Sequence, residues 1–133
     1  MNEEDKNAYI RYSLEKADET FEVTILLNDN FKWNSTINRL YYSSFYAVSA
    51  LLVQDGINAK SHSGVKSMFF LNYIKTKIIN IEYGKLYSDL FDWRQKGDYG
   101  DFFDFEGNDV KPIIKPTKEL IGIIKEIINK KNK

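Results

Sequence analysis

The segment RQKGDYGDF, Arg94 to Phe102, holds the residues of this chain best suited to chemistry. Arg94 is followed by Asp98 and then by Tyr99. The planar fork of an arginine guanidinium matches the oxygens of a phosphate. A carboxylate nearby can take up a proton, whereas a tyrosine hydroxyl with its usual pKa near ~10 keeps its own at neutral pH. Arg94 is therefore a candidate for binding a phosphate at a cleft, and Asp98 and Tyr99 are polar groups close to it in the chain.

The position of Arg94 on its helix supports this interpretation. In the segment from about Glu82 to Lys96, apolar residues recur at helical spacing, and Arg94 follows Leu90 by four residues on the same stripe. An unpaired charge on that side costs several kcal/mol. Arg94 must therefore meet either an anion in a cleft or a structural ion-pair partner: Asp98, Asp101 or an acid of the first helix.

A second group of candidates lies on one face of the segment from Asn34 or Ser35 to Gln54. At about 100° per residue, Arg39, Tyr42 and Tyr46 share the face opposite the most apolar one. Aromatic rings stack on nucleobases, and a second arginine adds positive charge. These residues can therefore line the same cleft as Arg94 and bind RNA or a nucleotide. The alternative is that the face packs on a neighbouring helix or on a second copy of the chain, with its hydroxyls hydrogen-bonded.

The only histidine, His62, stands between two serines in the predicted loop DGINAKSHSG, residues 55–64. Histidine is the side chain whose usual pKa suits proton transfer near neutral pH. His62 therefore joins the candidates for RNA contact, provided that the fold brings it to Arg94. The alternative is a loop or helix-start residue, because serine is a good helix N-cap.

Other common sites have no matching pattern. The acids between positions 98 and 109 lack the spacing of an EF-hand loop, so they indicate a solvated loop. The segment around Ser61 and Ser63 is not the nucleophile elbow of a serine hydrolase, and no glycine-rich loop suited to phosphates occurs. We expect neither a metal ion nor an organic cofactor.

The elements that carry these residues are predicted to be helices. Apolar residues recur at helical rather than alternating spacing from about Glu3 to Leu27, Asn34 to Gln54, Gly64 to Ile78 and Glu82 to Lys96, and again across the C-terminal isoleucines. Residues 97–109 are predicted to form a loop, and Pro116 either a first helical turn or a kink. Apolar residues cover most of the third segment, so we expect it to be the most buried. The pattern indicates an all-α bundle of about five helices with up-and-down connections.

Composition places the chain in a broad class. With 133 residues, 43% of them hydrophobic, it is predicted to form a single domain over residues 1–133. It has no cysteine, no apolar run near the ~18 residues of a membrane span and a polar, acidic N-terminus. We therefore expect a soluble protein of the cytoplasm. The net charge of zero argues against a generally basic nucleic-acid binder, but not against a local basic site.

Three segments together resemble the HEPN domain: NRLYYSSFYAVSALL (38–52), SHSGVKSMFF (61–70) and YGKLYSDLFDWRQKGDYGDF (83–102). The resemblance implies a small helical bundle that forms homodimers and is encoded beside a minimal nucleotidyltransferase. It also implies a metal-independent ribonuclease that acts as the toxin of a toxin–antitoxin pair. The candidate catalytic residues of such an enzyme are Arg94, which can stabilise the charge that develops on the phosphate, together with Tyr99 and Asp98. In some such pairs the nucleotidyltransferase silences the toxin by adenylylating a tyrosine.

The HEPN motifs match in part. One motif places a histidine shortly after the arginine, and another places two tyrosines there. Arg94 and Tyr99 match the arginine and first tyrosine, whereas Asp101 stands at the second and no histidine follows Arg94. Two functions therefore stay open: an RNA-binding, toxin-like partner of a nucleotidyltransferase that cleaves RNA, or a helical module that only dimerises and docks a partner.

Overall fold

The computed structural model describes residues 1–100 and 103–132, and in these ranges the chain is helical without a strand. The elements are α1 (Glu3–Asp29), α2 (Trp33–Gln54), α3 (His62–Phe69), the π-helical turn η1 (Phe70–Ile74), α4 (Ile81–Tyr99) and α5 (Gly107–Lys131). The predicted all-α class is confirmed.

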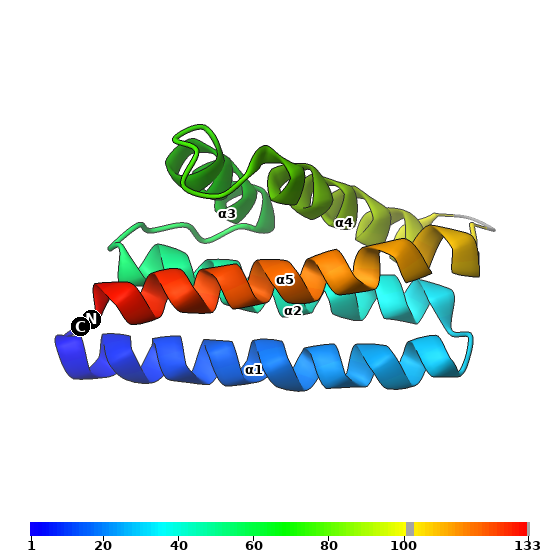
Figure 1. Ribbon diagram of the computed structural model, residues 1–133, viewed down its shortest axis with the longest axis horizontal. Coiled ribbons are helices and arrows are strands. Elements are labelled where there is room, and N and C mark those ends of the chain that lie inside the picture. Colours follow the sequence, from blue (N-terminus) through cyan, green and yellow to red (C-terminus); the bar gives the residue numbers. More distant parts are fainter. Residues whose placement is uncertain (101–102, 133) are drawn as a thin grey trace.

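The long helices run up and down in sequence, and α3 with η1 forms part of the connection between α2 and α4. Figure 1 shows α1, α2 and α5 side by side, with α3 and α4 packed on the other side of α2 and both termini at one end. Asn2, Ser61 and Asn80 start helices by accepting hydrogen bonds from the backbone N–H groups of Asp5, Gly64 and Glu82. These caps satisfy donors that a helix leaves free at its N-terminus.

The most buried helix is α2, and the prediction that the third segment would be the most buried is wrong. Helix α2 contacts α1, α3, α4 and α5, and many of its side chains are fully buried, including Leu40, Tyr41 and Leu51. In the third segment Leu71 and Ile78 are 50% and 55% exposed. The apolar pattern of that segment was continuous, but its outer side has no helix to pack against.

The boundaries around the predicted loop 97–109 also differ. Helix α4 continues to Tyr99 and α5 begins at Gly107, so Asp98 and Tyr99 lie on the last turn of α4. Asp109 supports the earlier start of α5, because its Oδ2 accepts the backbone N–H of Glu106 at 2.9 Å. Pro116 lies well inside α5, not in its first turn.

Asn34 connects the start of α2 to the chain between α4 and α5. Its Oδ1 accepts the backbone N–H of Phe105 at 2.8 Å, and its Nδ2 donates to the carbonyl of Phe103 at 3.0 Å. Asn34 is thus the second residue of α2 and not its N-cap, because α2 begins at Trp33. This link fixes the chain that leaves α4 beside the start of α2.

Helices long and apolar enough to cross a membrane are absent from the described part of the chain.

Candidate functional site

The interior of the α2–α4 interface contains Arg94, as the apolar stripe predicted. The side chain is 8% exposed, and its Cζ lies 4.8 Å from the centroid of the Tyr41 ring and 5.7 Å from that of Tyr42. Leu86, Tyr87 and Leu90 precede it on the same buried side of α4. The aromatic faces on α2 therefore supply the immediate environment of the guanidinium.

The hydrogen bonds of Arg94 are incomplete. Its Nη1 donates to the Tyr42 hydroxyl at a long 3.5 Å, and its buried Nε has no hydrogen-bond partner among the described residues. A cation–π contact contributes about 2 kcal/mol when desolvated, which is less than the several kcal/mol that burial of a charge costs. An anion bound beside Arg94 would therefore offset the part of this cost that the rings do not.

The predicted ion pair of Arg94 with Asp98 or with an acid of α1 does not form. Ion pairs between the described residues join Lys85 to Asp89, Lys125 to Asp18 and Lys131 to Asp55. Asp98 instead accepts a hydrogen bond from Asn38 Nδ2 at 3.0 Å. The remaining named candidate, Asp101, lies outside the described residues.

The second arginine of the site is Arg39, which the sequence predicted to lie near Arg94. Its Cζ lies 5.0 Å from the Tyr42 ring centroid, and its Nε and Nη2 donate to Asn38 Oδ1 at 2.9 and 2.7 Å. Two guanidinium groups thus lie against the ring of Tyr42. Neither forms an ion pair with a described carboxylate, so the surroundings of this ring are locally positive. We call Arg39, Tyr41, Tyr42, His62 and Arg94 the arginine cluster.

Asp98 and Tyr99 lie beside Arg39 and not beside Arg94. They line a hollow of about 650 Å³ whose wall includes Arg39, Asn38 and Gly97, and in which Arg94 takes no part. Tyr99 is 77% exposed, so its ring is open to a ligand. The predicted catalytic triplet is therefore split, with Arg94 in the interior and Asp98 and Tyr99 at the rim.

The aromatic face of α2 packs within the fold, which is one of the two alternatives that the sequence left open. Tyr42 packs edge-on against Phe45 at 6.1 Å between ring centroids and also receives the contact from Arg94. Tyr46 is half-buried, and its ring lies 6.2 Å from that of Tyr42. Tyr46 therefore supports Tyr42 by packing, and no hydrogen bond links it to either arginine among the described residues.

His62 reaches the arginine cluster across the fold. It is the first residue of α3, and its Nδ1 lies 2.7 Å from the Tyr41 hydroxyl. Its ring centroid lies 5.7 Å from that of Tyr41 and 5.8 Å from that of Tyr42. Burial and the nearby charge of Arg94 lower the pKa of His62 below its usual value. His62 is thus both a helix-start residue and a neighbour of Arg94.

Tyr41 is the member of the cluster that the sequence analysis missed. Its position on the apolar face of α2 made it a core residue, and it is indeed fully buried. Burial raises its pKa to about 12, so its hydroxyl keeps its proton at neutral pH. Its hydroxyl could have indicated this role in the sequence, because a tyrosine buried on an apolar face needs a polar partner.

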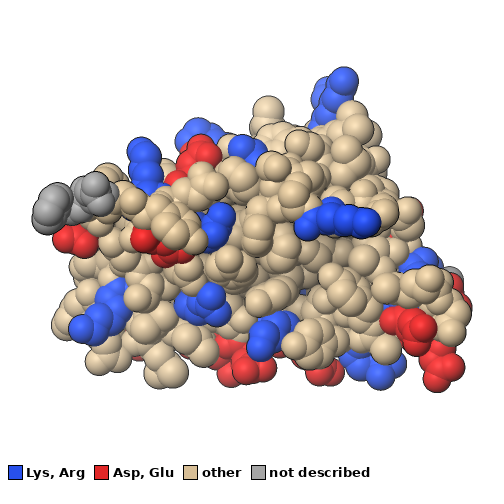
Figure 2. All heavy atoms as spheres, turned by 180° about the vertical axis from the view of Figure 1, so that it is seen from behind, with Lys and Arg blue, Asp and Glu red and all other residues tan. Residues whose placement is uncertain are grey.

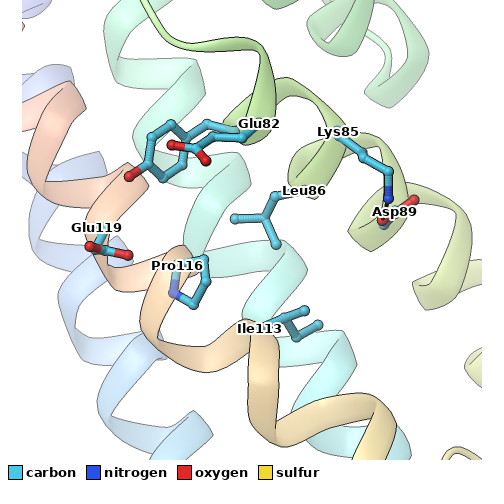
Figure 3. Close-up of a pocket in the computed structure, with 8 residues that line it drawn as sticks. Glu82, Lys85, Leu86, Asp89, Ile113, Pro116 and Glu119 are labelled. Atoms are coloured by element: carbon cyan, nitrogen blue, oxygen red, sulfur yellow. Dashed lines mark hydrogen bonds and ion pairs between the residues drawn. The ribbon is translucent and has the colours of Figure 1, made fainter.

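A separate hollow lies between the first half of α4 and α5, away from the predicted site residues. Figure 3 shows Leu86, Ile113 and Pro116 along it, with Glu82 and Glu119 at one end and the Lys85–Asp89 pair at the other. The described residues contain no group of three or more acidic or histidine side chains arranged to hold a metal ion.

The charged surface is otherwise mixed. Figure 2 shows separate basic side chains over a broad uncharged surface, with acidic groups between some of them. On this face, therefore, the basic side chains do not form a continuous basic patch.

Comparison with known proteins identifies relatives over most of the chain. The HEPN domain model matches residues 10–127. The chain is 38% identical to a UPF0332 protein of Thermotoga maritima over 96% of both chains. It is 29% identical to "Putative toxin MJ0142" of Methanocaldococcus jannaschii, over 90% of this chain and 81% of that protein. It is also 31% identical to "Putative toxin MJ0605" of the same organism, over 68% of this chain and 67% of that protein.

Proposed function

This chain belongs to the HEPN domain family, and on that premise we propose that it is a toxin-like protein that binds RNA and cleaves it without a metal ion at the arginine cluster. The observation that carries the proposal is the buried guanidinium of Arg94 beside the second guanidinium of Arg39 on the Tyr42 ring. The Nε of Arg94 has no hydrogen-bond partner in the described part of the chain. Two arginines that form no ion pair with a described carboxylate suit a phosphate.

The chemistry that fits this arrangement is attack of a ribose 2′-hydroxyl on the adjacent phosphate. Negative charge then develops on the phosphate oxygens, and preorganised donors in a site of low polarity stabilise it most effectively. Arg94 is such a donor because packing against Tyr41 holds it before the ligand arrives. The exposed ring of Tyr99 and the hollow beside Arg39 offer a place for a base next to the phosphate.

The biological role that we propose is a toxin paired with a nucleotidyltransferase. The relatives from Methanocaldococcus jannaschii carry the word toxin in their names, which supports the first half of this role. Tyr99 is exposed at the end of α4, so a modifying partner can reach its hydroxyl. We also propose that two copies of the chain form a homodimer. In this dimer the arginine clusters of both copies would contact one RNA.

The second candidate function is a docking module without chemistry. The observation that favours it is the exposed apolar group Leu71, Ile78 and Ile81 around the connection from η1 to α4. Exposed apolar groups of this kind are common in protein interfaces.

Cleavage of RNA by matched arginine variants distinguishes the two functions. Purified parent protein, Arg94→Met, Arg94→Lys and the surface control Arg11→Met are incubated with single-stranded RNA in a chelator. We expect cleavage by the parent and the control, a loss of at least about 100-fold in Arg94→Met, comparable with the loss of one preorganised donor, and partial loss in Arg94→Lys. No cleavage by folded parent protein, or equal cleavage by Arg94→Met, would favour the docking module.

A further inference from the structure

We infer that His62 is the group that accepts the proton of the ribose 2′-hydroxyl, and that Tyr41 is a positioning residue that holds the imidazole for this step. The inference rests on the ribonuclease function proposed above. It assigns the proton acceptor to the start of α3 rather than to Asp98, the carboxylate that the sequence offered for this role.

His62 and Arg94 both lie close to the rings of Tyr41 and Tyr42. The guanidinium lies within 6 Å of the Tyr41 and Tyr42 centroids, at 4.8 and 5.7 Å, and the imidazole centroid at 5.7 and 5.8 Å. Phe45 completes the environment at 4.5 Å between its ring centroid and that of His62. A phosphate bound by Arg94 would therefore lie beside the imidazole, although the two residues come from different helices.

Asp98 is a poorer proton acceptor for this reaction. Its Oδ2 is engaged by Asn38, and it lines the hollow beside Arg39 in which Arg94 takes no part. His62, by contrast, has one engaged nitrogen, Nδ1, and its partly exposed ring leaves Nε2 without a hydrogen bond to any described residue. Nε2 is therefore the imidazole nitrogen that remains available to accept a proton.

The charges around His62 favour the form that can accept a proton. Tyr41 and Tyr42 face it from α2 and Arg94 from α4; Phe45 is uncharged. Burial first, and then the charge of Arg94, lower the pKa of His62. The imidazole is consequently neutral at neutral pH, which a general base requires.

Tyr41 fixes the orientation of the imidazole. A hydroxyl can either donate or accept, so its partnership with Nδ1 is compatible with both neutral forms of histidine. When Nε2 acts as the base, Nδ1 carries the hydrogen and donates it to the Tyr41 oxygen. The same bond persists once Nε2 is protonated, because both nitrogens are then donors.

The step balances with these residues and water. The 2′-oxygen forms a bond to phosphorus as its proton moves to His62 Nε2, while Arg94 and Arg39 face the developing negative charge. The bond between phosphorus and the 5′-oxygen breaks, and that oxygen takes a proton from water. The products are a 2′,3′-cyclic phosphate and a 5′-hydroxyl, and the imidazolium returns its proton to water.

The test uses the fact that this chain has one histidine, so protein without a histidine tag gives unambiguous imidazole signals in NMR. The variant His62→Asn keeps a polar group near Tyr41 but cannot take up a proton. We expect it to lose at least about 100-fold in cleavage, the usual scale of general acid–base catalysis. It should still bind a DNA strand of the same sequence, which lacks the 2′-hydroxyl, about as well as the parent does. Ser63→Ala is the matched control and should cleave at the parent rate.

Two further measurements separate catalysis from a structural role. The rate of the parent should rise with pH and level off at the pKa that NMR gives for His62. Tyr41→Phe keeps the aromatic ring against Arg94 but should lower kcat with little change in KM, and it should change the distribution of hydrogen between Nδ1 and Nε2 seen in the nitrogen spectra.

The outcomes separate this inference from the proposed function. If the parent cleaves RNA and Arg94→Met does not, but His62→Asn cleaves normally, the ribonuclease stands and the role of His62 is overturned. A cleavage rate that does not change with pH around the pKa of His62 also overturns the role of His62. If folded parent protein does not cleave RNA at all, both proposals fall.

Discussion

Arg94 lies in the interior because it is on the buried side of α4. There its guanidinium contacts the rings of Tyr41 and Tyr42 on α2. Those rings offset only part of the desolvation of the charge. An anion would add charge-assisted hydrogen bonds at the Nε that now lacks a partner. At the scale of single residues, the site is therefore defined by a buried arginine that forms no ion pair with a described carboxylate.

The lowered pKa of His62 predicts a pH dependence of stability. Above the usual histidine pKa of 6.5, both the folded and the unfolded chain hold a neutral imidazole. As pH falls below that value, the unfolded chain takes up a proton first, because folding lowers the pKa, so the free energy of unfolding decreases. We expect the parent to lose more stability than His62→Asn between about pH 7.5 and pH 5 in denaturant titrations. An equal loss in the two proteins would contradict the lowered pKa.

Single residues also show what the sequence could and could not predict. The inward position of Arg94 followed from its spacing to Leu90, and Arg39 was correctly placed near it. The contact of His62 with Tyr41 could not be predicted, because it joins residues 21 apart through the relative position of α2 and α3. Helical periodicity describes one helix at a time and contains no information on which helix faces which.

Among the helices, α2 organises the site. It contributes Arg39, Tyr41 and Tyr42, and it contacts every other α-helix of the described chain. Sequence patterns identified its length well, but its central position depends on how the other helices pack around it. The same limit applies to the end of α4, which extends past Gly97 to Tyr99, where a side chain at position 97 would meet Asn34 and Phe105.

Asn34 predicts how this end of the bundle responds to mutation. Asn34→Ala removes the side-chain hydrogen bonds to the Phe105 N–H and the Phe103 carbonyl. We expect a loss of about 1–3 kcal/mol in the free energy of unfolding, the cost of leaving such groups without a partner. Hydrogen exchange at the Phe105 amide should also become faster. The exposed residue Asn58 provides the control Asn58→Ala, which should leave both values unchanged; unchanged exchange in Asn34→Ala would contradict the proposed link.

For the molecule as a whole, positive and negative charges are equal in number, but two of the three arginines lie together. The net charge is zero, and the surface in Figure 2 alternates basic, acidic and uncharged regions. Of the three arginines in the chain, Arg39 and Arg94 meet at the Tyr42 ring, whereas Arg11 is exposed on α1. Binding of an anionic strand should therefore involve one local site and spare the rest of the surface.

The arginine side chains allow the most direct test of this account, because three residues give three separable Nε–H signals in NMR. A short DNA strand, which binds without being cleaved, is titrated into the labelled protein. We expect the Nε–H signals of Arg94 and Arg39 to move together and to saturate at one affinity, while the signal of Arg11 stays in place. A titration in which the Arg94 signal does not move, or in which all three signals shift alike, would contradict a phosphate site at the arginine cluster.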